Sequence, residues 1–365
     1  MGSLQTINSE FVKFIPREGA GSLLVFLGSR GAKRFEYEKY FKDADFHQLH
    51  IREKAGARWY LDGVPGIADD LPGMAEAIDR VAEICKVKEV IVLGSSMGGY
   101  AALAIGGLVR ARKVIAFSPQ IKLHKGWSFT PEDNSKAARI DIRRIVQAAT
   151  ETNFKVISST EVMDVYHAST LSALPNVDTS LMVSLHNVVP TTTRKGGGSQ
   201  LLEDAVAGDI ATEAPLSLLA PIGALEEFND AYFNKKYAAA LSAMYSVKAA
   251  AQDWPEAHLM EGHCHYSMWD YERAISCYLL AAPKIFHLNA AHYVHLIVAY
   301  AKVGDRDNSV KAFADYLDLI DELEVDRTPY LSRLRAFSVT AKTVELTGLI
   351  DRMVAHFASG ADYPA

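Results

Sequence analysis

One serine stands in a G-x-S-x-G pattern, Gly94-Ser95-Ser96-Met97-Gly98. The apolar run EVIVL precedes the pattern and the Ala-rich run GYAALAIGGLV follows it, which predicts a strand, a sharp turn and a helix. A serine held in such a strained turn needs glycines beside it, because a Cβ there would collide with the neighbouring strand or helix. The pattern therefore predicts Ser96 as a nucleophile.

A serine hydroxyl attacks well only when a base takes its proton and a third group orients that base. His186 follows the strand-like run SLMVSL and is the predicted base. Two acids follow the preceding strand-like run FKVISS: Glu161, nearer to the strand end, and Asp164, expected as a helix N-cap. We favour Asp164 and keep Glu161 as the alternative acid.

The order of strand, G-x-S-x-G turn, helix and the next strand KVIAFS resembles the α/β-hydrolase fold of serine esterases, lipases, thioesterases and acyl-transferring relatives. The resemblance implies an acyl-serine intermediate and an oxyanion hole made of two backbone N–H groups. One would come from Met97, and the other from Ser29 or Arg30 in the loop after LLVFLG. The D-x-x-H-A segment that begins at Asp164 is also similar to small members of this family.

The segment between KVIAFS and FKVISS, where many hydrolases insert a lid, has only about 35 residues. It leaves little room for a large cap and predicts an open site for a bulky or polymeric substrate. Trp127 and Phe129 are expected to line its mouth as substrate-binding residues. The sequence does not choose among ester, thioester and acyl-sugar substrates, or between hydrolysis and acyl transfer.

The elements that must position these groups form an α/β pattern up to about residue 187, which predicts a doubly wound, mostly parallel sheet. Runs such as VIVLG are apolar at nearly every position, as in strands covered on both faces. The expected strands are Ser22–Gly28, Phe46–Ile51, Glu89–Gly94, Lys113–Ser118, Phe154–Ser159 and Ser180–Leu185, and the expected helices are Pro72–Lys86, Gly98–Arg110, Ala137–Thr150 and Asp164–Leu174.

The second half of the chain has a helical pattern with an internal repeat. Ala240, Ala274 and Ser309 are equivalent small residues of the repeat and lie 34 and 35 residues apart. This period resembles a degenerate tetratricopeptide array of about three helix-turn-helix units, in which Trp269 replaces the usual turn glycine. We therefore expect a catalytic domain over residues 1–190, a linker over 191–225 and a helical repeat domain over 226–358.

Composition excludes several classes of protein. The 365 residues include 38 Lys and Arg against 44 Asp and Glu, a net charge of −6, which argues against a nucleic-acid partner. The three cysteines contain no C-x-x-C pair, which fits a reduced, cytoplasmic protein. The N-terminal sequence is not that of a secretory signal, and no run is long and apolar enough for a membrane span.

No cofactor or metal is expected. The histidines of the second half scatter over different helix faces and show no closed metal-binding spacing; they are His258, His263, His265, His287, His292 and His295, with Cys264 beside them. Two functional hypotheses follow. The first is a serine hydrolase or acyltransferase whose repeats recruit a protein, peptide or large substrate. The alternative is a non-catalytic adaptor with a degenerate hydrolase domain.

Overall fold

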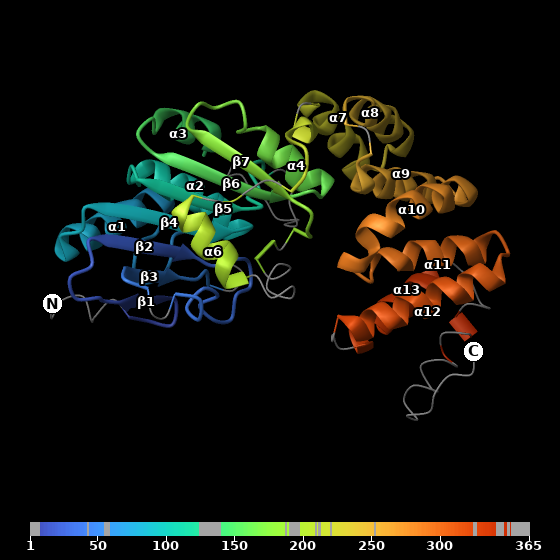
Figure 1. Cartoon of the computed structure of the whole chain (residues 1–365), viewed down its shortest axis with the longest axis horizontal. Coiled ribbons are helices and arrows are strands. Elements are labelled where there is room, and N and C mark those ends of the chain that lie inside the picture. Colours follow the sequence, from blue (N-terminus) through green and yellow to red (C-terminus); the bar gives the residue numbers. More distant parts are fainter. Residues whose placement is uncertain are drawn as a thin grey trace. The chain divides into compact units, whose positions relative to one another are not determined.

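The structure of the chain is a computed structural model, which describes residues 8–41, 44–54, 59–123, 140–186, 188–189, 198–208, 210, 213–219, 221–251, 253–323, 327–340, 347–348 and 351. The chain divides into two compact units, Met1–Phe233 and Asn234–Ala365. The first is built on a sheet and the second of helices (Figure 1). In this described part, no helix has the length and apolar character needed to cross a membrane.

In the described part of the first unit, seven strands form one sheet in the order β1-β3-β2-β4-β5-β6-β7. All neighbouring strands are parallel except β1, which pairs antiparallel with β3 at one edge. This mostly parallel sheet matches the α/β-hydrolase fold that the sequence predicts. The strands are β1 (Val12–Ile15), β2 (Ser22–Leu27), β3 (His47–Ile51), β4 (Glu89–Ser95), β5 (Lys113–Phe117), β6 (Asn153–Ser159) and β7 (Val177–Met182).

Five of the six expected strands lie within about a residue of their observed bounds. The sixth, β7, ends at Met182 rather than Leu185, because its pairing with β6 ends where Ser159 meets Met182. Strand β1 was not predicted, since the four residues VKFI at an edge give only a weak alternating pattern. The expected base, His186, lies in the loop after this strand, four residues beyond its end.

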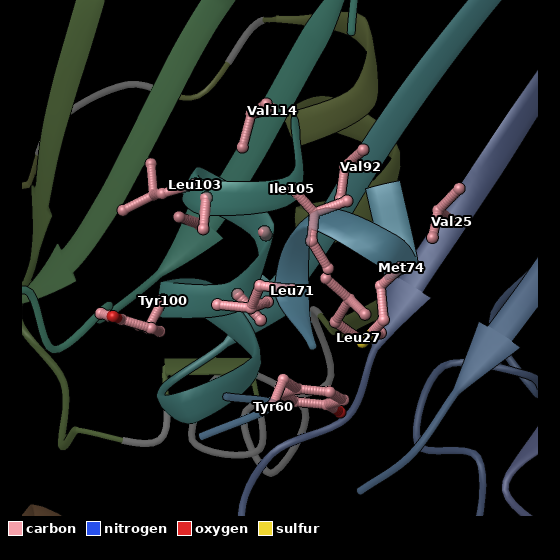
Figure 2. Close-up of a cluster of buried hydrophobic side chains, with 14 of the residues drawn as sticks. Val25, Leu27, Tyr60, Leu71, Met74, Val92, Tyr100, Leu103, Ile105 and Val114 are labelled. Carbon is pink, nitrogen blue, oxygen red and sulfur yellow. The ribbon is translucent and has the colours of Figure 1, made fainter. Parts of the chain in front are cut away.

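Helices cover both faces of this sheet. Alternate residues of β2 point to opposite faces: Val25 and Leu27 belong to one core cluster with α1 and α2, and Phe26 belongs to another. Figure 2 shows Val25 and Leu27 among the side chains of this first cluster, together with Met74 of α1. The described helices of the unit are α1 (Leu71–Cys85), α2 (Met97–Leu108), α3 (Ile142–Ala148), α4 (Val162–Ser169), α6 (Gly198–Ala207), η3 (Leu216–Leu219) and α7 (Ile222–Phe233).

The segment 191–225, expected as a linker, holds helix α6 and the turn η3. Leu201, Leu202 and Ala205 of α6 pack with Phe26 and Leu24 in the second core cluster. Because α6 buries its apolar face on the sheet, it belongs to the first unit, and the boundary between the units falls at Phe233. The Gly- and Ser-containing stretch before α6 concealed this helix in the sequence.

The second unit consists of consecutive helices, in which neighbours along the chain pack on one another from α8 to α13. They are α8 (Tyr237–Ala250), α9 (Pro255–Ser267), α10 (Tyr271–Ile285), η4 (Phe286–Leu288), α11 (His292–Lys302), α12 (Arg306–Glu322) and α13 (Arg327–Thr340). The three small residues Ala240, Ala274 and Ser309 are all buried. Gly262 faces the ring of Tyr278, 2.5 Å from where a Cβ would lie.

A structural period accompanies the sequence period of this unit. Lys235, Trp269 and Gly304 all have positive φ, at 59°, 70° and 81°, and each stands two residues before the first residue of a helix. Asp270 and Asp305, the residues after the last two, cap their helices by accepting from Arg273 N and Asn308 N. The residue with positive φ ends one helix, and the aspartate after it caps the start of the next helix.

Candidate active site

Ser96 lies in the sharp turn between β4 and α2, with φ 53° and ψ −115°. Its N–H donates to Phe117 O of β5 at 2.8 Å, which ties the turn to the neighbouring strand. A Cβ at Gly94 would overlap the Gly98 carbonyl, and a Cβ at Gly98 would overlap the carbonyl oxygen of Leu27 at the end of β2. The two glycines therefore allow strand, turn and helix to approach closely enough to hold a left-handed serine.

His186 connects this serine to an acid. Its Nε2 lies 2.8 Å from Ser96 Oγ and its Nδ1 lies 2.7 Å from Asp164 Oδ1. An ionised carboxylate only accepts hydrogen bonds, so Nδ1–H donates to Asp164 and Nε2 accepts from the serine hydroxyl. Ser96 is half-buried, whereas Asp164 is 1% exposed. The arrangement can move a proton from Ser96 Oγ to the imidazole.

Besides His186, two serine hydroxyls donate hydrogen bonds to the Asp164 carboxylate. Its Oδ2 accepts from Ser159 Oγ at 2.6 Å, and the Ser118 hydroxyl also hydrogen-bonds the carboxyl. Burial opposes the charged form, but His186, Ser159 and Ser118 outweigh it and lower the pKa of Asp164 below 3.8. The carboxylate is therefore ionised at neutral pH.

The interaction between Asp164 and His186 shifts the pKa of the histidine in the opposite direction. Burial favours neutral His186, but the charge and hydrogen bond of Asp164, with a smaller contribution from Glu161, raise the pKa of His186 above 6.5. Asp164 thus stabilises the imidazolium that forms when Ser96 loses its proton.

The structure separates the two acids that the sequence left open. Asp164 meets His186, whereas Glu161 is the N-cap residue of α4 and makes no side-chain capping bond. Asp164, expected as the N-cap, lies instead in the first turn of the helix, because α4 begins at Val162. A first-turn carboxylate is also favoured by the helix dipole.

Ser118 and Ser159 were not singled out in the sequence. Ser118 directly follows β5, and Ser159 is the last residue of β6. The carboxyl ends of these neighbouring parallel strands meet at one edge of the sheet, and Ser159 N donates to Ser118 Oγ at 3.2 Å. In the sequence, the only sign of this role is a serine at the end of each strand. The pairing register of β5 and β6 is what brings both hydroxyls to Asp164.

The expected oxyanion donors differ in their surroundings. Met97 N–H is at the start of α2, where helix N–H groups have no intrahelical acceptor. Ser29 N–H and Oγ–H both donate to the Glu36 carboxylate, at 2.6 Å each. The Gly28 carbonyl, one residue earlier, accepts from Tyr60 Oη at 2.8 Å. Arg30, the other expected donor, is exposed at the turn of this loop.

The expected substrate-binding residues Trp127 and Phe129 lie outside the described residues. A polar contact joins α7 to α4: Glu226 of α7 pairs with Lys122, and its Oε1 lies 3.5 Å from the Tyr166 hydroxyl. Tyr166 is on α4, two residues after Asp164. This contact ties α7 to the helix that carries the acid.

No family model matches the chain, and no curated protein matches its sequence. Its structure is similar to that of the capsule O-acetyltransferase of Neisseria meningitidis serogroup A, at 15% identity over 54% of this chain and 92% of that chain, with a TM-score of 0.42. MGS-MChE2, an alpha/beta hydrolase enzyme from a sediment metagenome of the Mar Chica lagoon, is 16% identical over 53% of this chain and 93% of that one, with a TM-score of 0.38. The enol-lactonase of Burkholderia xenovorans LB400 is 12% identical over 54% of this chain and 96% of that chain, with a TM-score of 0.38.

Proposed function

We propose that the first unit is a serine hydrolase or acyltransferase that works through an acyl-Ser96 intermediate. The observation that carries this proposal is the continuous hydrogen-bonded chain from Ser96 through His186 to Asp164. His186 takes the proton as Ser96 Oγ attacks the acyl carbon, and then gives it to the leaving group. Water or an acceptor hydroxyl, activated by the same imidazole, then releases the acyl group.

The tetrahedral oxyanion formed in these steps needs two donors. Met97 N–H is one. Because Ser29 N–H already donates to Glu36, we assign the second to the Arg30 backbone N–H. The acyl substrate is an ester or thioester, including acyl-sugars or polymers.

The second unit is proposed as a tetratricopeptide-like repeat domain that recruits a protein, peptide or large substrate. The common period of small buried residues and of left-handed turn residues supports this assignment. All three cysteines are free thiols, which is consistent with the reduced, cytoplasmic location that we propose.

The test is a fluorophosphonate probe, which phosphonylates an activated serine. We expect a mass-spectrometric adduct on Ser96, its loss in Ser96→Ala and His186→Ala, and loss of p-nitrophenyl acetate turnover in both variants. Ser95→Ala is the matched control, because Ser95 precedes Ser96 but lies outside the hydrogen-bonded chain, and it should keep the adduct. If wild-type Ser96 does not react in a folded protein, the adaptor alternative holds instead.

A further inference from the structure

Three side chains of metal-binding type meet inside the helical unit: Glu261, His265 and Cys277. One ligand atom from each lies within 4.8 Å of the other two. The residues are 6%, 3% and 8% exposed, respectively. All three belong to the second unit, so the cluster is separate from the Ser96 site.

The helices explain this meeting. Glu261 and His265 are four residues apart on α9 and share one of its faces. Cys277 comes from α10, which packs against α9. Two ligands from one helix and a third from its partner define a site without any loop, so the positions are set by the helix pair itself.

Two imidazoles, one in the cluster and one beside it, have a buried nitrogen without a hydrogen bond from the described residues. No described residue hydrogen-bonds His265 Nδ1, and Asp270 Oδ2 is 3.4 Å from it. His258 Nδ1 is likewise buried without a hydrogen bond from the described residues, 3.7 Å from Glu261 Oε2. Leaving a buried ring nitrogen without a hydrogen bond is unfavourable, so a further ligand at these rings would be stabilising. A carboxylate beside one ring nitrogen is also the common environment of a metal-binding histidine.

We propose that this cluster binds one thiophilic divalent cation of the zinc class, held by the Glu261 carboxylate, the His265 imidazole and the Cys277 thiolate. Cysteine, histidine and glutamate are zinc ligands, and three protein ligands leave a fourth position for water or a further residue. His258, three residues before Glu261 on α9, is the nearby candidate for that position. The cation would join α9 to α10.

The charges balance when the cation enters. In the empty site Cys277 is a free cysteine and carries a thiol proton at neutral pH. Formation of the metal–sulfur bond breaks the S–H bond and releases one proton to solvent. The thiolate and carboxylate then neutralise the two positive charges. Lys248, whose Nζ lies 2.6 Å from Glu261 Oε2, must move away, and its side chain is 27% exposed.

The experiment uses the full chain after removal of metal by a chelator. We expect one equivalent of Zn²⁺ to be taken from a chromophoric chelator, and Co²⁺ to give the near-ultraviolet thiolate-to-cobalt absorption band. Cys277→Ser should abolish the band and weaken Zn²⁺ binding more than about 100-fold, beyond the 10- to 100-fold typical of residues that only support ligands. His265→Gln should weaken binding similarly with helical circular dichroism unchanged.

Cys264→Ser is the matched control for Cys277→Ser, since Cys264 is also buried, on α9 beside His265, but is outside the cluster. It should keep both the band and the affinity. Lys248→Met should tighten Zn²⁺ binding by removing the competing ammonium group. Failure of the folded wild-type chain to take Zn²⁺ from the chelator overturns the proposal, as does an equal loss of the cobalt band in Cys264→Ser and Cys277→Ser.

Discussion

His186 Nε2 lies 2.8 Å from Ser96 Oγ, although 90 residues separate the two in the chain. Ser96 leaves the end of β4 and His186 follows β7, so the sheet brings the pair together. Asp164, on the helix after β6, completes the chain of hydrogen bonds. The segments that follow β4, β6 and β7 of one sheet thus bring the nucleophile, the acid and the base together.

The two candidate acids give the first prediction. Asp164→Asn should lower kcat for p-nitrophenyl acetate by about 10⁴-fold, because an amide no longer holds the imidazole in its productive tautomer. Glu161→Gln should keep kcat within about threefold, since the charge of Glu161 contributes less to the pKa of His186 than Asp164 does. Steady-state kinetics of the two variants checks this, and the reverse ranking would reassign the acid.

The pH dependence follows from the base. Ser96 is activated only by neutral His186, and Asp164 raises the pKa of His186 above 6.5. We therefore expect kcat/KM to fall as the pH drops through a midpoint that lies above 6.5. Glu161→Gln should move the midpoint to lower pH, because it removes a negative charge that stabilises the imidazolium. A midpoint below 6.5 in the wild type contradicts this account.

The sequence predicts the central elements of this site well and the supporting ones poorly. Ser96 and its glycines are local, so the turn between β4 and α2 can be read from a few adjacent residues. The contacts of Ser118 and Ser159 depend on how β5 and β6 pair, which no local pattern states. Helix α6 falls in the segment expected as a linker, because its apolar residues follow a Gly-rich run.

Ser159 is predicted to be a positioning residue for Asp164. Ser159→Ala removes a 2.6 Å hydrogen bond to a buried carboxylate, and bonds to charged groups contribute about 1.5–3 kcal/mol. We expect the free energy of unfolding of the first unit to fall by about 2 kcal/mol, measured by urea titration. With p-nitrophenyl acetate, kcat should fall while KM stays constant; an unchanged kcat assigns Ser159 a purely structural role.

Trp269 is predicted to destabilise the turn between α9 and α10. It has φ 70° and is 77% exposed, so its indole gains little from packing while its Cβ opposes the left-handed backbone. Trp269→Gly should raise the stability of the second unit by about 1 kcal/mol, seen as a higher Tm. Trp269→Ala retains the Cβ and should give little of this gain; equal gains in both variants would point to the indole instead.

Gly98 is predicted to be irreplaceable in the turn that holds Ser96. A Cβ there would overlap the Leu27 carbonyl oxygen and lie 2.8 Å from that of Gly28. Both are backbone atoms, so α2 must shift away from β2, which moves Ser96 relative to His186. Gly98→Ala should therefore abolish fluorophosphonate labelling and lower Tm by several degrees, whereas Gly21→Ala, where a Cβ meets nothing within 4 Å, should leave labelling intact. Normal labelling of Gly98→Ala would mean that the close approach of α2 to β2 does not set the position of the nucleophile.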